Sequence, residues 1–358
     1  MKVVLPYVSI QPNKLTTYLH YDETGDTRTY TNTYDVTELD NKAHGIMSQK
    51  ANKRVRLAID WLLYLAKEKP LASKKFPSGL KFKLNFITLT MSSPQFYRDS
   101  NNKLKANHTD NEIKSKLLNQ FLTELREKYK CTNYLWRAES QSNGNIHFHI
   151  CTDVFIPWRV LRTDWNRIQE KLGYISAYEA KSKKTDPNST DIHSINAVRN
   201  LGSYLSKYCT KNSHGYTVLA TKAQVQPFRP PSFLTYKHPK FNPKSKFYRQ
   251  IHGKLWGQSQ GLSKYSSAKC EITGIIQQEL EFLQRVKKEK VKFMERATMY
   301  LVDVKELIAR NCQALSTKFL NYVKNPSKEP PPPILRTNIF EALNVIAPKF
   351  EQQSITFA

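Results

Sequence analysis

Residues 144–150 read GNIHFHI, and this short stretch decides the fold around it. Successive side chains of a β-strand point to opposite faces, so His147 and His149 share one face and the apolar residues share the other. Two imidazoles in this arrangement can bind one metal ion, while the apolar face packs on a core. A His-x-His pair is weak evidence by itself, because most such pairs are ordinary strand residues.

Residues 133–139 form the predicted hairpin partner of this strand, joined to it through an Asn-Gly turn. Glu139 is the candidate third metal ligand, and the length of the turn decides its face. A two-residue loop sets Glu139 opposite Phe148, on the wrong face, whereas an odd-numbered loop or a bulge sets it opposite His147. Assigning Glu139 to the site is therefore a prediction about the turn.

Hydrophobic periodicity predicts the elements around this hairpin. Helical spacing covers residues 48–69, 111–130, 157–172 and 197–211, and strand patterns cover residues 81–91, 174–179 and 191–195. Residues 1–45 indicate no more than a loose strand or hairpin. Hairpins and returning helices in this order predict an α+β fold, in which helices pack on an antiparallel sheet.

The C-terminal part reads as mainly helical. Residues 271–324 carry apolar residues at seven-residue spacing, which is consistent with a coiled coil. Polar residues interrupt this seam, so a helix pair that folds back on the body is the alternative. We expect five parts: an N-terminal extension with an amphipathic helix, a central domain, a basic aromatic segment, a long helical region, and a Pro-rich spacer with a tail. Their bounds are 1–78, 79–212, 213–265, 266–326 and 327–358.

The charge of the chain points to a polyanionic partner. It has 56 Lys and Arg against 30 Asp and Glu, a formal net charge of +26, which favours nucleic acid. Residues 211–260 contain no acidic residue and interleave basic with aromatic side chains, as a groove for single-stranded DNA requires. A small aromatic core beneath a charged surface is the alternative. The candidate DNA-binding residues are Lys222, Arg229, Lys237, Lys240, Lys244, Lys246, Arg249, Lys254 and Trp256.

Cysteine usage and hydropathy favour a cytoplasmic protein. The 5 cysteines are widely spaced with no CxxC pair, which is typical of reduced thiols and not of a disulfide framework or a zinc ribbon. No segment approaches the roughly 20 apolar residues that a membrane span needs, and the N-terminus lacks the pattern of a signal peptide. We therefore expect no membrane partner.

Residues 204–211 read YLSKYCTK, with two Tyr-x-x-Lys motifs in tandem. On a helix, Tyr204 and Tyr208 project from one face. A phenol is a poor nucleophile at neutral pH unless a cation favours the phenolate or a metal makes its target more electrophilic. Lys207 and Lys211 can supply the first effect, and a metal on the two histidines can supply the second. The alternative is that both tyrosines only pack.

The order of three motifs resembles that of the HUH endonucleases: FITLT at residues 86–90, HFH at residues 147–149, and the tandem tyrosine motif at residues 204–208. More narrowly, it is similar to the rolling-circle replication initiators of small single-stranded DNA phages, the microvirus type. The resemblance covers about residues 80–212, and residues 254–259 also look like a Trp-Gly segment of that group. It implies that the central domain is an HUH endonuclease domain with an RRM-like or ferredoxin-like palm.

The same resemblance implies a site and a reaction. A divalent metal, Mg²⁺ or Mn²⁺, is expected on His147, His149 and a polar residue, here Glu139, and the nucleophile is Tyr204 or Tyr208. The implied reaction nicks single-stranded origin DNA, leaving a 5′-phosphotyrosine and a free 3′-OH primer, and later rejoins the strand. The order of attack and the oligomeric state stay open.

The implied partners are the replication origin as single-stranded DNA, a host DNA polymerase, and a host helicase, because the chain has no GxxxxGK[ST] motif. The location would be the cytoplasm of the host cell. A plasmid initiator, a two-tyrosine HUH transposase or a relaxase would use the same chemistry. A non-catalytic single-stranded DNA-binding protein and a structural or packaging protein are alternatives of other classes.

Overall fold

The computed structural model describes residues 4–21, 47–73, 76–141, 143–194, 251–294 and 297–326. The chain divides into two compact units, residues 31–263, called the central unit below, and residues 1–30 with 264–358, called the terminal unit. Both units combine antiparallel strands with helices, which confirms the predicted α+β fold. The expected N-terminal extension, residues 1–78, is divided between the two units.

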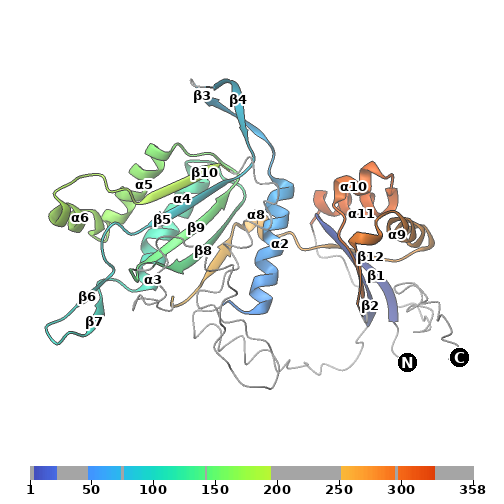
Figure 1. The fold of residues 1–358 in the computed structure, drawn as a ribbon, viewed down its shortest axis with the longest axis horizontal. Coiled ribbons are helices and arrows are strands. Elements are labelled where there is room, and N and C mark those ends of the chain that lie inside the picture. The colour runs from blue at the N-terminus through green and yellow to red at the C-terminus, as the bar shows by residue number, and fades with distance from the viewer. Residues whose placement is uncertain are drawn as a thin grey trace, which may run out of the picture. The chain divides into compact units, whose positions relative to one another are not determined.

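The central unit contains a sheet of five strands in the order β10-β5-β9-β8-β11 (Figure 1). All four neighbouring pairs are antiparallel. The strands are β5 (Asn85–Thr90), β8 (Tyr134–Ser140), β9 (Ile146–Thr152), β10 (Thr190–Ser194) and β11 (Trp256–Gln258). The histidine strand, β9, lies in the middle of this sheet, so pairing on both of its edges fixes its register.

Helices and two hairpins complete the central unit. The α3–α4 helix consists of α3 (Asp110–Ile113), a π-helical turn (Lys114–Leu118) and α4 (Asn119–Glu127) in direct succession. The other helices are α2 (Gln49–Leu65), α5 (Trp158–Glu170), α6 (Tyr174–Ser182) and α8 (Gln260–Ser263). The hairpins are β3 (Lys69–Ser73) with β4 (Phe76–Phe82), and β6 (Phe96–Arg98) with β7 (Leu104–Ala106). The last predicted helix, residues 197–211, lies outside the described residues.

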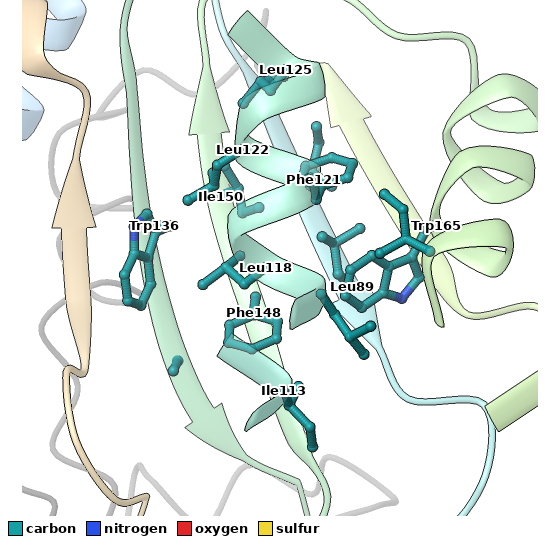
Figure 2. Close-up of a cluster of buried hydrophobic side chains, with 14 of the residues drawn as sticks. Leu89, Ile113, Leu118, Phe121, Leu122, Leu125, Trp136, Phe148, Ile150 and Trp165 are labelled. Atoms are coloured by element: carbon teal, nitrogen blue, oxygen red, sulfur yellow. The ribbon is translucent and has the colours of Figure 1, made fainter. Parts of the chain in front are cut away.

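One face of the sheet packs against the α3–α4 helix and α5. Figure 2 shows Leu118 and Phe121 of the helix beside Phe148 and Ile150 of β9. The shared core also includes Ile87, Leu89, Ile113, Leu117, Leu125, Trp136, Ile146, Leu161 and Trp165, all buried. Because alternate residues of β9 fill this core, the strand presents its two histidines on the opposite face.

Residues 174–179 are predicted as a strand, and this prediction is wrong: they belong to helix α6. Gly173, at a φ of +72°, separates α5 from α6. The Glu170 carboxylate then accepts hydrogen bonds from the backbone N–H groups of Ile175 and Ser176, at 3.1 and 2.9 Å. It satisfies donors that the first turn of a helix leaves free. This interaction crosses the break between two helices, and strand alternation carries no trace of it.

The terminal unit joins the two ends of the chain in a second sheet, in the order β12-β1-β2-β14-β13. Its strands are β1 (Val4–Gln11), β2 (Lys14–Tyr21), β12 (Ala268–Glu271), β13 (Val291–Met294) and β14 (Ala297–Tyr300). Its helices are α9 (Gly274–Val286), α10 (Val304–Ala309) and α11 (Gln313–Lys324). The C-terminal part is mainly helical as predicted, but β13 and β14 interrupt it, so no coiled coil runs through residues 271–324. Pairing with the distant N-terminal hairpin overrides the local helical pattern.

The described cysteines and helices bear on two of the sequence predictions. Cys131, Cys151, Cys270 and Cys312 are buried free thiols, as predicted. Cys209 lies outside the described residues. Among the described helices, none combines the length and the hydropathy that crossing a bilayer requires.

Asp164 ties α5 to the end of the α3–α4 helix. Its carboxylate accepts hydrogen bonds from Lys128 Nζ at 2.8 and 2.7 Å and from the Tyr129 hydroxyl. Burial favours a raised pKa for Asp164, but the bonds from Lys128 and Tyr129 outweigh it and lower the pKa. A carboxylate with a lowered pKa stabilises the fold above its unfolded pKa of about 3.9, and this contribution is lost as the pH falls through the folded value.

Asp164→Asn is therefore expected to destabilise the central unit by about 1–3 kcal/mol at pH 7, since it removes the charge from these bonds. The difference from wild type should shrink as the pH falls below about 4. Urea unfolding at pH 7 and pH 3 measures both effects by tryptophan fluorescence, because all 5 tryptophans lie in the central unit. Equal unfolding midpoints at pH 7 would contradict the prediction.

Candidate functional site

The turn between β8 and β9 places Glu139 on the face of the histidines. Glu139 pairs with His147 across the two strands, and Ser140 pairs with Ile146. Residues 141–145 therefore form the loop, an odd number, which is the register that puts Glu139 opposite His147. Gly144 has a φ of +85°, a left-handed conformation that glycine adopts without steric cost.

The three side chains converge. Glu139 Oε2 lies 3.8 Å from His147 Nε2 and 3.7 Å from His149 Nε2. The two imidazole centroids are 4.6 Å apart at 69°. Donor atoms around one octahedral or tetrahedral ion lie roughly 3–3.5 Å apart, so a small adjustment would bring these three onto a single ion. No other group of three His, Cys, Asp or Glu side chains converges in this way within the described residues.

Two residues of β5 hold the His149 ring. Thr88 pairs with His149 across the strands, and its Oγ1 lies 3.1 Å from His149 Nδ1. Phe86 stacks on the same imidazole, with centroids 5.1 Å apart at 26°. Partners of this kind on the far nitrogen fix the tautomer and the orientation of a ligating histidine. Sequence reasoning missed both residues, although alternation along FITLT places Thr88 and Phe86 on one face.

Arg137 and the burial of the site set its protonation. The Arg137 side chain is only 4% exposed, and its Nε lies 3.2 Å from Glu139 Oε1. Burial favours a raised pKa for Glu139, but His147, His149 and Arg137 outweigh it, so the pKa of Glu139 lies well below its usual range. Burial lowers the pKa of His147, against the opposing effect of Glu139. An ionised carboxylate and a neutral imidazole are the states that bind metal.

The site meets a further requirement for a metal ligand set. Both ring nitrogens of His147 are buried and lack a hydrogen-bond partner among the described residues. Buried polar atoms are rarely left unsatisfied, and each one calls for an explanation such as an ion. The nitrogen and oxygen donors, their charge and their spacing fit a divalent cation. Sequence reasoning named these three ligands but missed Arg137, which lies two residues before Glu139 and so on the same face.

Two predicted DNA-binding residues lie within the described residues. Trp256 pairs with Arg137, so β11 places this partly exposed indole on the face of the histidines. Lys254 is exposed, with its Nζ 6.0 Å from the ring centroid of Trp136, a residue of the opposite, core face. The other candidates lie outside the described residues: Tyr204, Lys207, Tyr208, Lys211, Lys222, Arg229, Lys237, Lys240, Lys244, Lys246 and Arg249.

Glu139→Gln is expected to weaken Mn²⁺ binding by at least about 10-fold, because it keeps the size of the side chain but removes the only anionic donor of the three. Titration calorimetry of the full chain measures the affinity. Glu127→Gln is the matched control, since it makes the same change at an exposed carboxylate of α4. Equal Mn²⁺ affinity in the two variants would remove Glu139 from the ligand set.

A comparison with family models matches this part of the chain. Residues 85–213 match the family described as replication-associated protein ORF2. The matched region begins with β5, contains β8 and β9 with the three converging side chains, and includes the tandem tyrosine motif. A search of curated proteins finds no match for the chain. The strand framework and histidine pair of this chain thus lie within a region similar to replication-associated proteins, which supports a general role in the initiation of DNA replication.

Proposed function

We propose that this protein is a rolling-circle replication initiator that nicks and rejoins single-stranded origin DNA, with the chemistry of an HUH endonuclease of the microvirus type. The observation that carries the proposal is the convergence of Glu139, His147 and His149 on one sheet face. It lies inside the region similar to replication-associated proteins. A replication protein that only bound DNA would have no use for three metal-binding side chains on this face.

The proposed ligands of a divalent ion, Mg²⁺ or Mn²⁺, are Glu139, His147 and His149. Such an ion, when bound, supplies positive charge that polarises a phosphate oxygen and makes the phosphorus more electrophilic. Thr88 orients His149, and Arg137 keeps Glu139 ionised. On the same face, Trp256 is available to stack on a base of the single strand.

The proposed nucleophile is the phenolate oxygen of Tyr204 or Tyr208, favoured by Lys207 and Lys211. It bonds to the phosphorus as the bond from phosphorus to the 3′ oxygen breaks, which leaves a 5′-phosphotyrosine and a free 3′-OH. After one round the second tyrosine cleaves the regenerated origin, and the released 3′-OH attacks the first phosphotyrosine. Because that linkage conserves the energy of the phosphodiester bond, joining requires no ATP.

The proposed partners follow from this reaction. Single-stranded origin DNA would be bound by the basic aromatic segment, residues 213–265, with its lysines and arginines on phosphates. A host DNA polymerase would extend the 3′-OH, and a host helicase would separate the strands, in the cytoplasm of the host cell. A plasmid initiator, a transposase or a relaxase would share the nicking step and differ in the DNA that it recognises.

A covalent-capture experiment tests the proposal. Labelled single-stranded oligonucleotides that tile the DNA encoding the protein are incubated with Mn²⁺ or Mg²⁺ and the full chain. Wild type is compared with Tyr204→Phe, Tyr208→Phe, the double variant, and Tyr178→Phe of α6 as a matched control. We expect a protein-linked DNA band that EDTA removes, that only the double variant lacks, and that the control retains. Tight binding with no covalent product from any oligonucleotide would support the non-catalytic single-stranded DNA-binding protein.

A further inference from the structure

The β6–β7 hairpin is an exposed two-stranded ribbon that stands clear of the five-stranded sheet (Figure 1). Its strands pair in antiparallel register, with Tyr97 opposite Lys105. Tyr97 is 47% exposed and the Lys105 side chain is 57% exposed. Arg98 and Lys103 are exposed as well. An aromatic ring and three cations are therefore displayed on a projecting element.

The root of this hairpin is fixed to the histidine strand through Gln95, which is fully buried. The Gln95 backbone N–H donates to Asn145 Oδ1 at 2.8 Å, and its Oε1 accepts from the backbone N–H of Ile146 at 2.9 Å. Ile146 is the residue before His147. The root of the ribbon is thus held one residue from a candidate metal ligand.

The other side of the root is fixed as well. Gln95 Nε2 donates to the His108 carbonyl and to Asp110 Oδ1, both at 3.0 Å. The Gln95 carbonyl accepts from the backbone N–H of Asn107 at 2.8 Å, which closes the hairpin at its base. A buried amide whose donors and acceptor are all used makes a rigid junction. The ribbon therefore has a set position relative to the metal centre.

The tip has a set shape and an excess of positive charge. Asp99 Oδ1 accepts from the backbone N–H groups of Asn101 and Lys103, at 3.0 and 2.9 Å, and its other oxygen pairs with Lys105 at 3.1 Å. Arg98 donates to the Asn102 carbonyl at 2.9 Å. Residues 96–106 carry three basic residues and one acid, so their formal charge is +2. Positive charge on an ordered ribbon is suited to phosphate groups.

We propose that the β6–β7 hairpin binds base-paired DNA next to the nick site by entering its major groove. That groove is about 12 Å wide and about 8.5 Å deep, and it admits a two-stranded ribbon. Strands of 3 residues extend about 10 Å, close to the depth of the groove. A projecting ribbon offers no concave track for a single strand, which binds in grooves of the protein. The inference rests on the proposed function only in that the metal centre marks the nick site.

The test compares two fluorescein-labelled probes by fluorescence anisotropy, with EDTA present so that no cleavage occurs. One probe is a stem-loop with a single-stranded arm, and the other is an unstructured strand of equal length. The full chain carries Arg98→Ala, Lys103→Ala and Lys105→Ala together. The matched control carries Lys116→Ala, Arg126→Ala and Lys130→Ala, which remove the same charges from exposed positions on and just after the α3–α4 helix.

We expect the hairpin variant to bind the stem-loop at least about 10-fold more weakly, with the slope of log affinity against log salt reduced by about 2–3. Its preference for the stem-loop over the single strand should fall in proportion, while the control keeps the wild-type preference. Equal losses on both probes, or no loss on the stem-loop, would overturn the inference. Because binding is measured without cleavage, a wild-type protein that fails to nick DNA would overturn the proposed function and leave this result standing.

Discussion

The double variant His147→Ala, His149→Ala is expected to bind Mn²⁺ at least about 100-fold more weakly and to nick no faster than wild type in EDTA. Two of the three converging donors are removed, and one carboxylate cannot replace them. The same ion is proposed to polarise the scissile phosphate, so nicking and Mn²⁺ affinity should fall together. Calorimetry and the covalent-capture assay measure the two losses.

The control for this variant is His252→Ala, which removes an exposed imidazole elsewhere in the central unit. Its backbone N–H donates to Asp110 and is unaffected by the change. Because His147 makes no hydrogen bond among the described residues, the double variant is expected to remain folded, which near-ultraviolet circular dichroism checks. Unchanged Mn²⁺ affinity in a folded double variant would show that the histidines are ordinary strand residues.

Trp165→Ala is expected to lower the free energy of unfolding of the central unit by about 3–5 kcal/mol, the largest stability effect that we anticipate. Trp165 is fully buried and meets Phe121 and Phe148 edge to face, with centroids 5.9 and 6.4 Å apart. Its Nε1 donates to the Thr90 carbonyl at 2.8 Å, and Thr90 pairs with His147. Removing the indole therefore leaves a cavity and frees a carbonyl at the edge of the site.

Trp158→Ala is the matched control, because Trp158 lies on the same helix, α5, but is 50% exposed. Its ring contacts the guanidinium groups of Arg159 and Arg162, 5.1 and 4.8 Å from the centroid, and exposed contacts of this kind contribute about 0.5–1 kcal/mol. Urea unfolding followed by the remaining tryptophans compares the two variants. Similar losses in both would mean that α5 does not anchor the core.

The separation of the central sheet into a core face and a histidine face follows from the sequence alone. Alternation in GNIHFHI assigns Phe148 to the core and the two histidines to the other face, and the structure confirms both. The four-residue spacing of Ile113, Leu117, Phe121 and Leu125 likewise predicts the buried stripe of the α3–α4 helix. These patterns are local, because the geometry of a strand or a helix fixes them within a few residues.

Only the tertiary structure decided which residues complete the histidine face. Glu139 joins the histidines because the loop has an odd number of residues, and Thr88 and Arg137 join them through strand pairing. The terminal unit forms because β1 pairs with β12, more than 250 residues away along the chain. Register and strand order depend on contacts between segments remote in sequence, and a shift of one residue would exchange the two faces of a strand. The periodicity of a sequence assigns each segment its faces, but only these contacts determine which face meets which.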